Sequence, residues 1–175
     1  QALAASRFPK QSDAQGKYIA ELNVEGEALL ETLGRCLTAG STLFVNDYGF
    51  ERGETLPVQY ANGTLRAYYR HRVLDDSLLW PGLLDITHHV DFAAMAEAAR
   101  RGGLTLASFQ TQSEFLQKHG ILDRLACDIK HGVEQNAEHN NAQGEMAYRS
   151  AAQAVRTLIA PEAMGGIFKV MEFRR

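Results

Sequence analysis

The sequence predicts an α/β fold, and three observations support this prediction. Leu43, Phe44 and Val45 are consecutive apolar residues, so their side chains would point to both faces of a strand in the middle of a covered sheet. An amphipathic stretch precedes this strand with only a short connection, which is typical of an α/β unit. The later strands that the pattern indicates are separated from one another by helices. At 175 residues and 45% apolar content, the chain is long enough for one domain with a sizeable core.

The composition argues against several classes of function. A formal charge of −3 gives no reason to expect a nucleic-acid or membrane-surface partner. No apolar run is long enough to span a bilayer, and no signal peptide is evident. Cys36 and Cys127 lack metal or redox spacing, so we expect buried or idle thiols in a reducing compartment. Because residues 1–17 are polar and the chain does not begin with Met, we expect a mobile N-terminal segment and a processed chain or a piece of a longer one.

The first predicted unit is a helix followed by the central strand. Apolar residues at helical spacing predict a helix over Tyr18–Leu37, and Gly40 follows as a stop signal. The strand Ser41–Phe50 is expected to end where polar residues begin at Asn46. In open α/β sheets, ligands bind outside the carboxyl ends of the strands, so Asp47 and Tyr48 would lie there. The alternative is an ordinary turn after a buried strand.

The middle of the chain is predicted to be less regular. Residues 51–62 resemble a polar loop, 63–73 are basic and aromatic, and 74–84 form an irregular crossing segment around Trp80-Pro81-Gly82. Asp91 is a good N-cap for a helix that ends at Gly102-Gly103.

The C-terminal part is predicted to alternate between strand and helix. A short strand at 104–109 precedes a helix opened by a Thr111–Glu114 capping box and closed at His119-Gly120. A further helix around 122–129 leads to residues 131–144, which indicate a solvated helix end or a mobile loop. A last helix, ended by Pro161, and a closing strand at 167–173 complete the chain. Three strands make a thin sheet, so part of the sheet is expected to be missing from this chain.

Residues 85–92 concentrate two carboxylates, a hydroxyl and two imidazoles. A metal site is one interpretation, since His and Asp are ordinary ligands. However, the adjacent His88 and His89 would point to opposite faces of a strand, and Asp91 is already explained as a helix cap. The sequence therefore predicts no metal site here.

The arginines of residues 63–73 have two interpretations. Arg66, Arg70 and Arg72 could bind an anion, with neighbouring tyrosines as stacking surfaces. Their even spacing favours the alternative, in which they line one face of a strand and pair with acids such as Asp75 and Asp76. No phosphate-binding loop, Gly-x-Gly-x-x-Gly fingerprint or Gly-x-Ser-x-Gly elbow is present, so we expect no cofactor-binding residue in this chain.

An ordered series of short motifs resembles the MidA family of S-adenosylmethionine-dependent methyltransferases, which includes the mitochondrial arginine methyltransferase needed to assemble respiratory complex I. The resemblance runs from about Tyr18 to the C-terminus and covers only the C-terminal portion of such an enzyme. Asn46, Leu84 and His88 depart from the family pattern. The motifs are Glu21-Leu22-Asn23, Asp47-Tyr48-Gly49, Gly63-Thr64-Leu65-Arg66, Tyr69-Arg70-His71-Arg72, Asp85-Ile86-Thr87, His89-Val90-Asp91-Phe92, and Met164-Gly165 with Phe168-Lys169-Val170.

The resemblance implies that residues 18–175 are the C-terminal part of a Rossmann-like class I methyltransferase sheet with flanking helices. It implies S-adenosylmethionine as cofactor, bound mainly outside this chain, and an arginine of a protein as acceptor. A carboxylate must orient the charged guanidinium and help remove its proton, and Asp47 has this chemistry, with Asp85 second. Tyr48 and His89 would shape the acceptor pocket or relay a proton.

The remaining candidate residues concern substrate binding. Arg66, Arg70 and His71 suit either the ordering of a loop over the cleft or an acidic stretch of a protein substrate, and Thr87 joins Asp85 in the predicted substrate-binding set. The alternatives are a non-catalytic protein-binding module for assembly and, more remotely, a metal-dependent hydrolase based on His71, Asp85 and His89. The expected partner is a protein substrate, with no nucleic acid or membrane, and a homodimer is compatible with this. The expected location is the cytoplasm of a bacterium or the mitochondrial matrix of a eukaryote.

Overall fold

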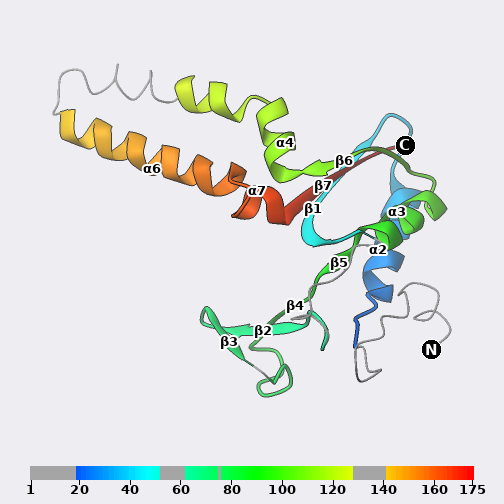
Figure 1. Ribbon diagram of the computed structural model, residues 1–175. Coiled ribbons are helices and arrows are strands. Elements are labelled where there is room, and N and C mark those ends of the chain that lie inside the picture. The colour runs from blue at the N-terminus through cyan, green and yellow to red at the C-terminus, as the bar shows by residue number, and fades with distance from the viewer. Residues whose placement is uncertain (1–18, 52–61, 75, 128–140) are drawn as a thin grey trace, which may run out of the picture. The chain divides into compact units, whose positions relative to one another are not determined.

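Strand β1 (Thr42–Phe50) contributes to both of the units into which the chain divides (Figure 1). The computed structural model describes residues 19–51, 62–74, 76–127 and 141–175. Within these, the first unit holds residues 19–41, 48–106 and 174–175, and the second holds 42–47 and 107–173. The predicted N-terminal segment 1–17, nearly all of the loop 51–62 and most of residues 131–144 lie outside the described residues.

β1 has a neighbouring strand on each side, as predicted, in the order β5-β1-β7-β6. Its end pairs in parallel with β5 (Val90–Asp91), with Gly49 opposite Val90. Two expectations for β1 are wrong. The strand runs on to Phe50 and does not end at Asn46, and its side chains are not buried on both faces, since Phe44 is 52% exposed.

Two helices, α2 (Val24–Cys36) and α3 (Phe92–Arg101), pack against each other in the first unit. α2 begins later than predicted, because the Asn23 side chain caps it by accepting from the Gly26 amide at 2.8 Å. α3 begins and ends as predicted: the Asp91 carboxylate accepts from the Ala94 amide at 2.9 Å, and Gly102 is the C-cap. The first unit buries Leu30 of α2 and Phe92, Ala94, Ala98 and Ala99 of α3.

A small antiparallel sheet in the order β3-β2-β4 was not predicted. It consists of β2 (Arg66–Tyr69), β3 (Arg72–Leu74) and β4 (Asp85–Thr87). Arg70 and His71 form the two-residue turn between β2 and β3 with φ angles of 48° and 65°, as hairpin turns of type I′ require. Arg66, Arg70 and Arg72 therefore do not line one face of a single strand, and that interpretation is wrong.

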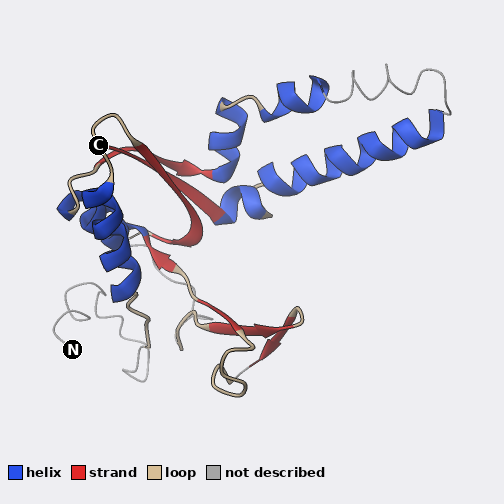
Figure 2. Cartoon of the chain, turned by 180° about the vertical axis from the view of Figure 1, so that it is seen from behind, coloured by secondary structure: helices blue, strands red, loops and turns tan. Residues whose placement is uncertain are grey.

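The second unit combines most of strands β6 (Thr105–Thr111) and β7 (Phe168–Arg174) with four helical segments (Figure 2). These are α4 (Gln112–Lys118), residues 121–127, α6 (Asn141–Ile159) and α7 (Met164–Ile167). The predicted capping box is present, since the Thr111 hydroxyl and the Glu114 carboxylate each bond the other residue's amide. Val170, Met171 and Phe173 of β7 are buried.

Two further observations concern the composition-based predictions. Cys36 and Cys127 are free thiols, and both are exposed, so of the two predicted alternatives, buried or idle, burial does not apply. Among the helices of the described residues, none combines the length and the apolarity that a membrane span needs.

Candidate functional site

Three segments far apart in the sequence meet in the first unit. Ile19 and Asn62 form an isolated parallel bridge, which brings the segment 19–23 beside residues 62–65. Residues 88–91 complete the group, since the His89 amide donates to the Thr64 hydroxyl at 2.9 Å. The segment 19–23 had been predicted as the first turn of a helix. It instead precedes α2, and this leaves its side chains available for contacts with the other two segments.

Glu21 is the centre of this arrangement. Its carboxylate accepts from the Thr64 amide at 3.0 Å, from the Thr64 hydroxyl at 3.0 Å and from the Leu65 amide at 3.1 Å. Burial acts to raise the pKa of Glu21, but the hydrogen bonds from Thr64 and Leu65 together outweigh it, so the pKa is lowered. Glu21 is therefore held in its charged form and fixes the start of the segment 64–66.

A glycine is needed beside Glu21. Gly63 has a φ of +85°, in the left-handed region that L side chains rarely adopt. A Cβ atom at this position would also lie 2.2 Å from Oε1 of Glu21. Gly63 therefore lets the chain turn close enough to the carboxylate for the next two amides to donate to it.

The network extends through Thr64 to an aromatic pair. Thr64 is 4% exposed, and its hydroxyl both donates to Glu21 and accepts from the His89 amide. The imidazole of His89 lies edge-to-face against the ring of Tyr48, with centroids 5.4 Å apart and an interplanar angle of 84°. Glu21 and Thr64 thus help to place the His89–Tyr48 pair.

The close approach of β1 and β5 completes this placement. A Cβ atom on Gly49 would lie 2.0 Å from the carbonyl oxygen of Val90. Only glycine fits between these two backbones, and the register sets Gly49 opposite Val90. Tyr48 and His89, which directly precede this pair, are therefore brought together by the strand pairing.

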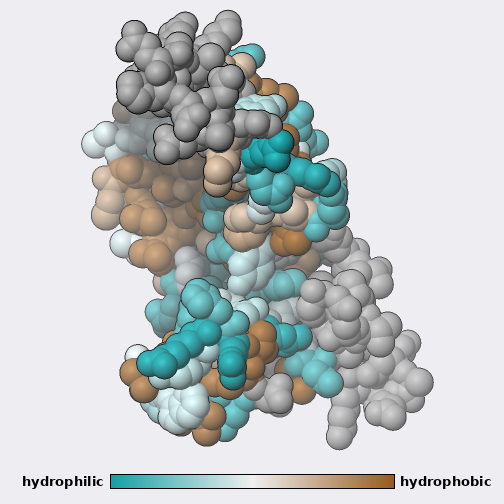
Figure 3. Space-filling model, turned by 90° about the vertical axis from the view of Figure 1, so that its left-hand side faces the viewer, coloured by the Kyte–Doolittle hydropathy of each residue, from teal (hydrophilic) through white to brown (hydrophobic). Residues whose placement is uncertain are grey.

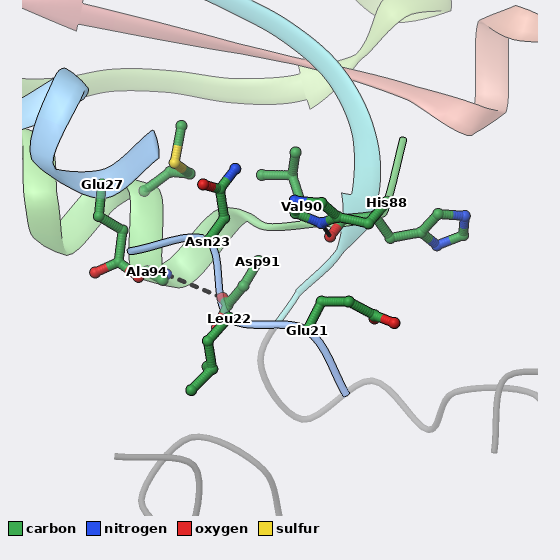
Figure 4. Close-up of a pocket in the computed structure, with 10 residues that line it drawn as sticks. Glu21, Leu22, Asn23, Glu27, His88, Val90, Asp91 and Ala94 are labelled. Atoms are coloured by element: carbon green, nitrogen blue, oxygen red, sulfur yellow. Dashed lines mark hydrogen bonds between the residues drawn. The ribbon is translucent and has the colours of Figure 1, made fainter. Parts of the chain in front are cut away.

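A small open pocket of about 20 Å³ lies next to this network (Figure 4). Figure 4 shows Glu21, Leu22 and Asn23 on one extended segment, near Val90, Asp91 and Ala94. The lining carboxylates are engaged: Glu21 with Thr64, Asp91 with the Ala94 amide, and Glu27 with Arg101 at 3.7 Å. The lining is thus acidic at Glu21 and Asp91, whereas Arg101 offsets the charge of Glu27, and an acidic lining suits a cationic group.

The structure brings together only some of the predicted site residues. Tyr48 and His89 are in contact, as expected for residues of one site. Asp47, half-buried, precedes Tyr48 within β1 and belongs to the second unit. The other candidates lie on the small sheet, where Arg66 is opposite Thr87, Asp85 is opposite Tyr68, and Arg70 and His71 form the turn.

Sequence reasoning missed the roles of Glu21 and Thr64. Both occur in motifs that carry the family resemblance. The sequence feature that could have indicated their role is the polar residue Thr64 directly after Gly63. Within the described ranges, no three His, Cys, Asp or Glu side chains come together as metal ligands. The hydrolase based on His71, Asp85 and His89 therefore has no supporting cluster in the structure.

Known proteins resemble this chain in both sequence and fold. A family model described as "Putative S-adenosyl-L-methionine-dependent methyltransferase" matches residues 2–110. The mitochondrial protein arginine methyltransferase NDUFAF7 of Mus musculus is 28% identical over 128 residues, which make up 73% of this chain and 27% of the mouse protein.

Two crystal structures from Burkholderia thailandensis share the fold. An uncharacterized protein is 36% identical with a TM-score of 0.75, over 90% of this chain and 39% of that chain. A member of the same superfamily, bound to S-adenosyl-homocysteine, is 34% identical with a TM-score of 0.79, over 99% of this chain and 40% of that chain. This chain thus spans between 27% and 40% of the length of these relatives.

Proposed function

This chain belongs to the family of S-adenosyl-L-methionine-dependent methyltransferases whose model matches residues 2–110, and we propose that it contributes the methyl-acceptor side of such an enzyme. The observation that carries the proposal is the convergence of Glu21, Thr64, His89 and Tyr48 near the carboxyl end of β1. In open α/β sheets this edge is where ligands bind.

The residues of this chain fit an acceptor better than they fit the adenosine part of the cofactor. The pocket is lined by three carboxylates and two histidines, whereas the sequence has no glycine-rich phosphate- or dinucleotide-binding fingerprint. S-adenosylmethionine would supply an activated methyl group. Protein side chains must do the rest: they bind the acceptor, orient it and remove its proton.

We propose a protein arginine as the acceptor. The name of the mouse relative supports this choice, and so do the carboxylates of Glu21 and Asp91 in the lining of the pocket. A guanidinium is charged at neutral pH, so its attacking nitrogen must lose a proton as the new N–C bond forms and the bond between methyl carbon and sulfur breaks. Asp47 would orient the guanidinium and take this proton, while Tyr48 and His89 would shape the acceptor pocket.

The remaining parts of the proposal concern substrate and setting. Arg66, Arg70 and His71, with Asp85 and Thr87 on the neighbouring strand, would contact the protein substrate beyond the acceptor. A role in complex I assembly and a mitochondrial location rest on the family resemblance and on the mouse relative's name, and they would apply to a eukaryotic source.

Asp47→Asn tests the catalytic role in the complete gene product. Asn keeps the size of Asp but loses the charge, and a charge-assisted contact contributes about 1.5–3 kcal/mol. We therefore expect single-turnover transfer of tritiated methyl groups from S-adenosylmethionine to protein to slow about 10- to 100-fold, with an unchanged melting temperature. Amino-acid analysis of the product should show methylarginine.

Asp123→Asn is the matched control, because it makes the same change at an exposed carboxylate of the second unit. A normal rate for Asp47→Asn with a lowered melting temperature would show that Asp47 only stabilises the strand. No transfer by the unaltered protein, despite binding of a protein partner, would favour the non-catalytic assembly module.

A further inference from the structure

Exposed apolar side chains concentrate on one part of the first unit. The described residues include seventeen large apolar side chains that are exposed, and seven of these fall between residues 65 and 86. Scattered exposed apolar residues are normal, whereas a contiguous group marks an interaction site. The seven are Leu65, Val73, Leu78, Leu79, Trp80, Leu83 and Ile86.

The most exposed of these side chains lie on the irregular loop 76–84, with Leu78 at 76% and Leu83 at 66%. This loop has defined turns. The Asp76 carboxylate accepts from the Leu78 amide at 2.8 Å, and the Trp80 carbonyl accepts from the Leu83 amide at 3.0 Å. Pro81 and Gly82, with its φ of +84°, then occupy the two central positions of a type II turn. The apolar side chains are therefore displayed by an ordered backbone.

An aromatic and cationic stack joins this loop to the hairpin β2–β3. The ring of Trp80 lies against that of Tyr69, with centroids 5.0 Å apart. The guanidinium of Arg70, a residue of the β2–β3 turn, lies 5.4 Å from the centroid of the Tyr69 ring. Trp, Tyr and Arg are the residues that most often dominate binding energy at interfaces, and side chains already held in position lose little entropy on binding.

The charge of the hairpin is opposite to that of the whole chain. Residues 63–74 contain Arg66, Arg70, His71 and Arg72 and no acidic residue, although the formal charge of the chain is −3. At the lower end of Figure 3, hydrophobic and hydrophilic side chains lie next to one another over the small sheet. The surface thus combines exposed apolar groups with the cations of the hairpin, while two carboxylates, Asp76 and Asp85, lie on the neighbouring loop and strand.

We propose that the small sheet β2–β4 and the loop 76–84 form a docking surface for a protein segment in which acidic side chains alternate with apolar ones. The cations of the hairpin would meet the acidic side chains, and Leu78, Trp80 and Leu83 would bury the apolar ones. A protein fits better than an anionic membrane, because a protein segment can place its acidic side chains against the arginines of the hairpin and its apolar ones beside Asp76 and Asp85, whereas a surface of lipid phosphates would face those two carboxylates as well. The proposal rests on the proposed function only where it takes the bound protein to be the substrate of methylation.

Binding is best measured without a methyl donor. A negative result then counts against the docking surface alone and leaves the proposed enzymatic activity untouched. The probe is a fluorescently labelled peptide in which Leu and Glu alternate, followed by anisotropy as the chain is added. Peptides with alternating Leu and Lys, and with alternating Ser and Glu, separate the charge and the apolar contributions. We expect the Leu–Glu peptide to bind at least about tenfold more tightly than either, and added salt to weaken its binding.

Two variants locate the binding to this surface. Arg70→Glu and the double variant Leu78→Ser/Leu83→Ser should each weaken binding of the Leu–Glu peptide about tenfold. Arg156→Glu makes the same charge reversal on α6, and Leu122→Ser makes one exposed Leu-to-Ser change in residues 121–127; both should leave binding unchanged. Circular dichroism confirms that each variant is folded.

Several outcomes would overturn the proposal. Equal affinity for the Leu–Glu and Ser–Glu peptides would show plain charge attraction, and equal affinity for the Leu–Lys peptide would remove the role of the arginines. Binding to phosphatidylcholine vesicles containing phosphatidylserine that the double variant abolishes would assign the surface to membranes. A dimer in sedimentation that the double variant dissociates would assign it to self-association.

Discussion

Glu21→Gln should destabilise the first unit, since this carboxylate accepts from three donors supplied by Thr64 and Leu65. Gln has the same shape but a single acceptor oxygen, and its amide would face one of the donors. Hydrogen bonds to a charged group contribute about 1.5–3 kcal/mol, and partial exposure of Glu21 places the effect near the lower value. We therefore expect a loss of about 1.5 kcal/mol in the free energy of unfolding near neutral pH.

The pH dependence gives this prediction a second signature. Because the folded-state pKa of Glu21 lies below its ordinary value of 4.5, its stabilisation is fully present above pH 4.5 and is lost as the pH falls through the folded-state value. Gln does not titrate. The stability gap between wild type and variant should thus be constant near neutral pH and should shrink in acid.

Urea unfolding followed by tryptophan fluorescence measures this gap. Trp80 is the single tryptophan of the chain and lies in the same unit as Glu21. Glu162→Gln, at an exposed carboxylate of the second unit, is the matched control and should change stability by less than about 0.5 kcal/mol. Equal urea midpoints for wild type and Glu21→Gln, or a gap that persists undiminished in acid, would refute the reasoning.

Three further predictions follow from the packing and from the sequence. Arg175→Gln should lower the free energy of unfolding by about 2 kcal/mol in urea titration, since its guanidinium donates to the carbonyls of Gly34 and Gly102 at 2.6 and 2.7 Å; an unchanged midpoint would contradict this. Gly49→Ala should disrupt the β1–β5 pairing, because its Cβ would lie 2.0 Å from the carbonyl oxygen of Val90; a normal amide-exchange pattern at Val90 would count against it. Calorimetric titration of this chain alone should show no micromolar, stoichiometric binding of S-adenosylmethionine, and such binding would place the cofactor site within the chain.

The sequence alone determined the features that depend on residues close together in the chain. The cap of α3 at Asp91, the capping box of Thr111 and Glu114, and the glycine end at Gly102 were predicted and are present. Each is a contact between residues no more than four positions apart, so the local sequence carries the whole signal. The alternation of helix and strand, which follows from the spacing of apolar residues, was also largely predicted.

Only the tertiary structure decided which distant segments meet and which surfaces stay exposed. The bond between Thr64 and Glu21 joins residues 43 positions apart, and the one between His89 and Thr64 spans 25 positions. The burial of β1 was misjudged for the same reason, because an apolar run shows that a strand could be covered without showing what covers it. The small sheet was missed because its strands are three or four residues long. Such short strands are held by cross-strand pairing, a long-range property that periodicity within one strand does not encode.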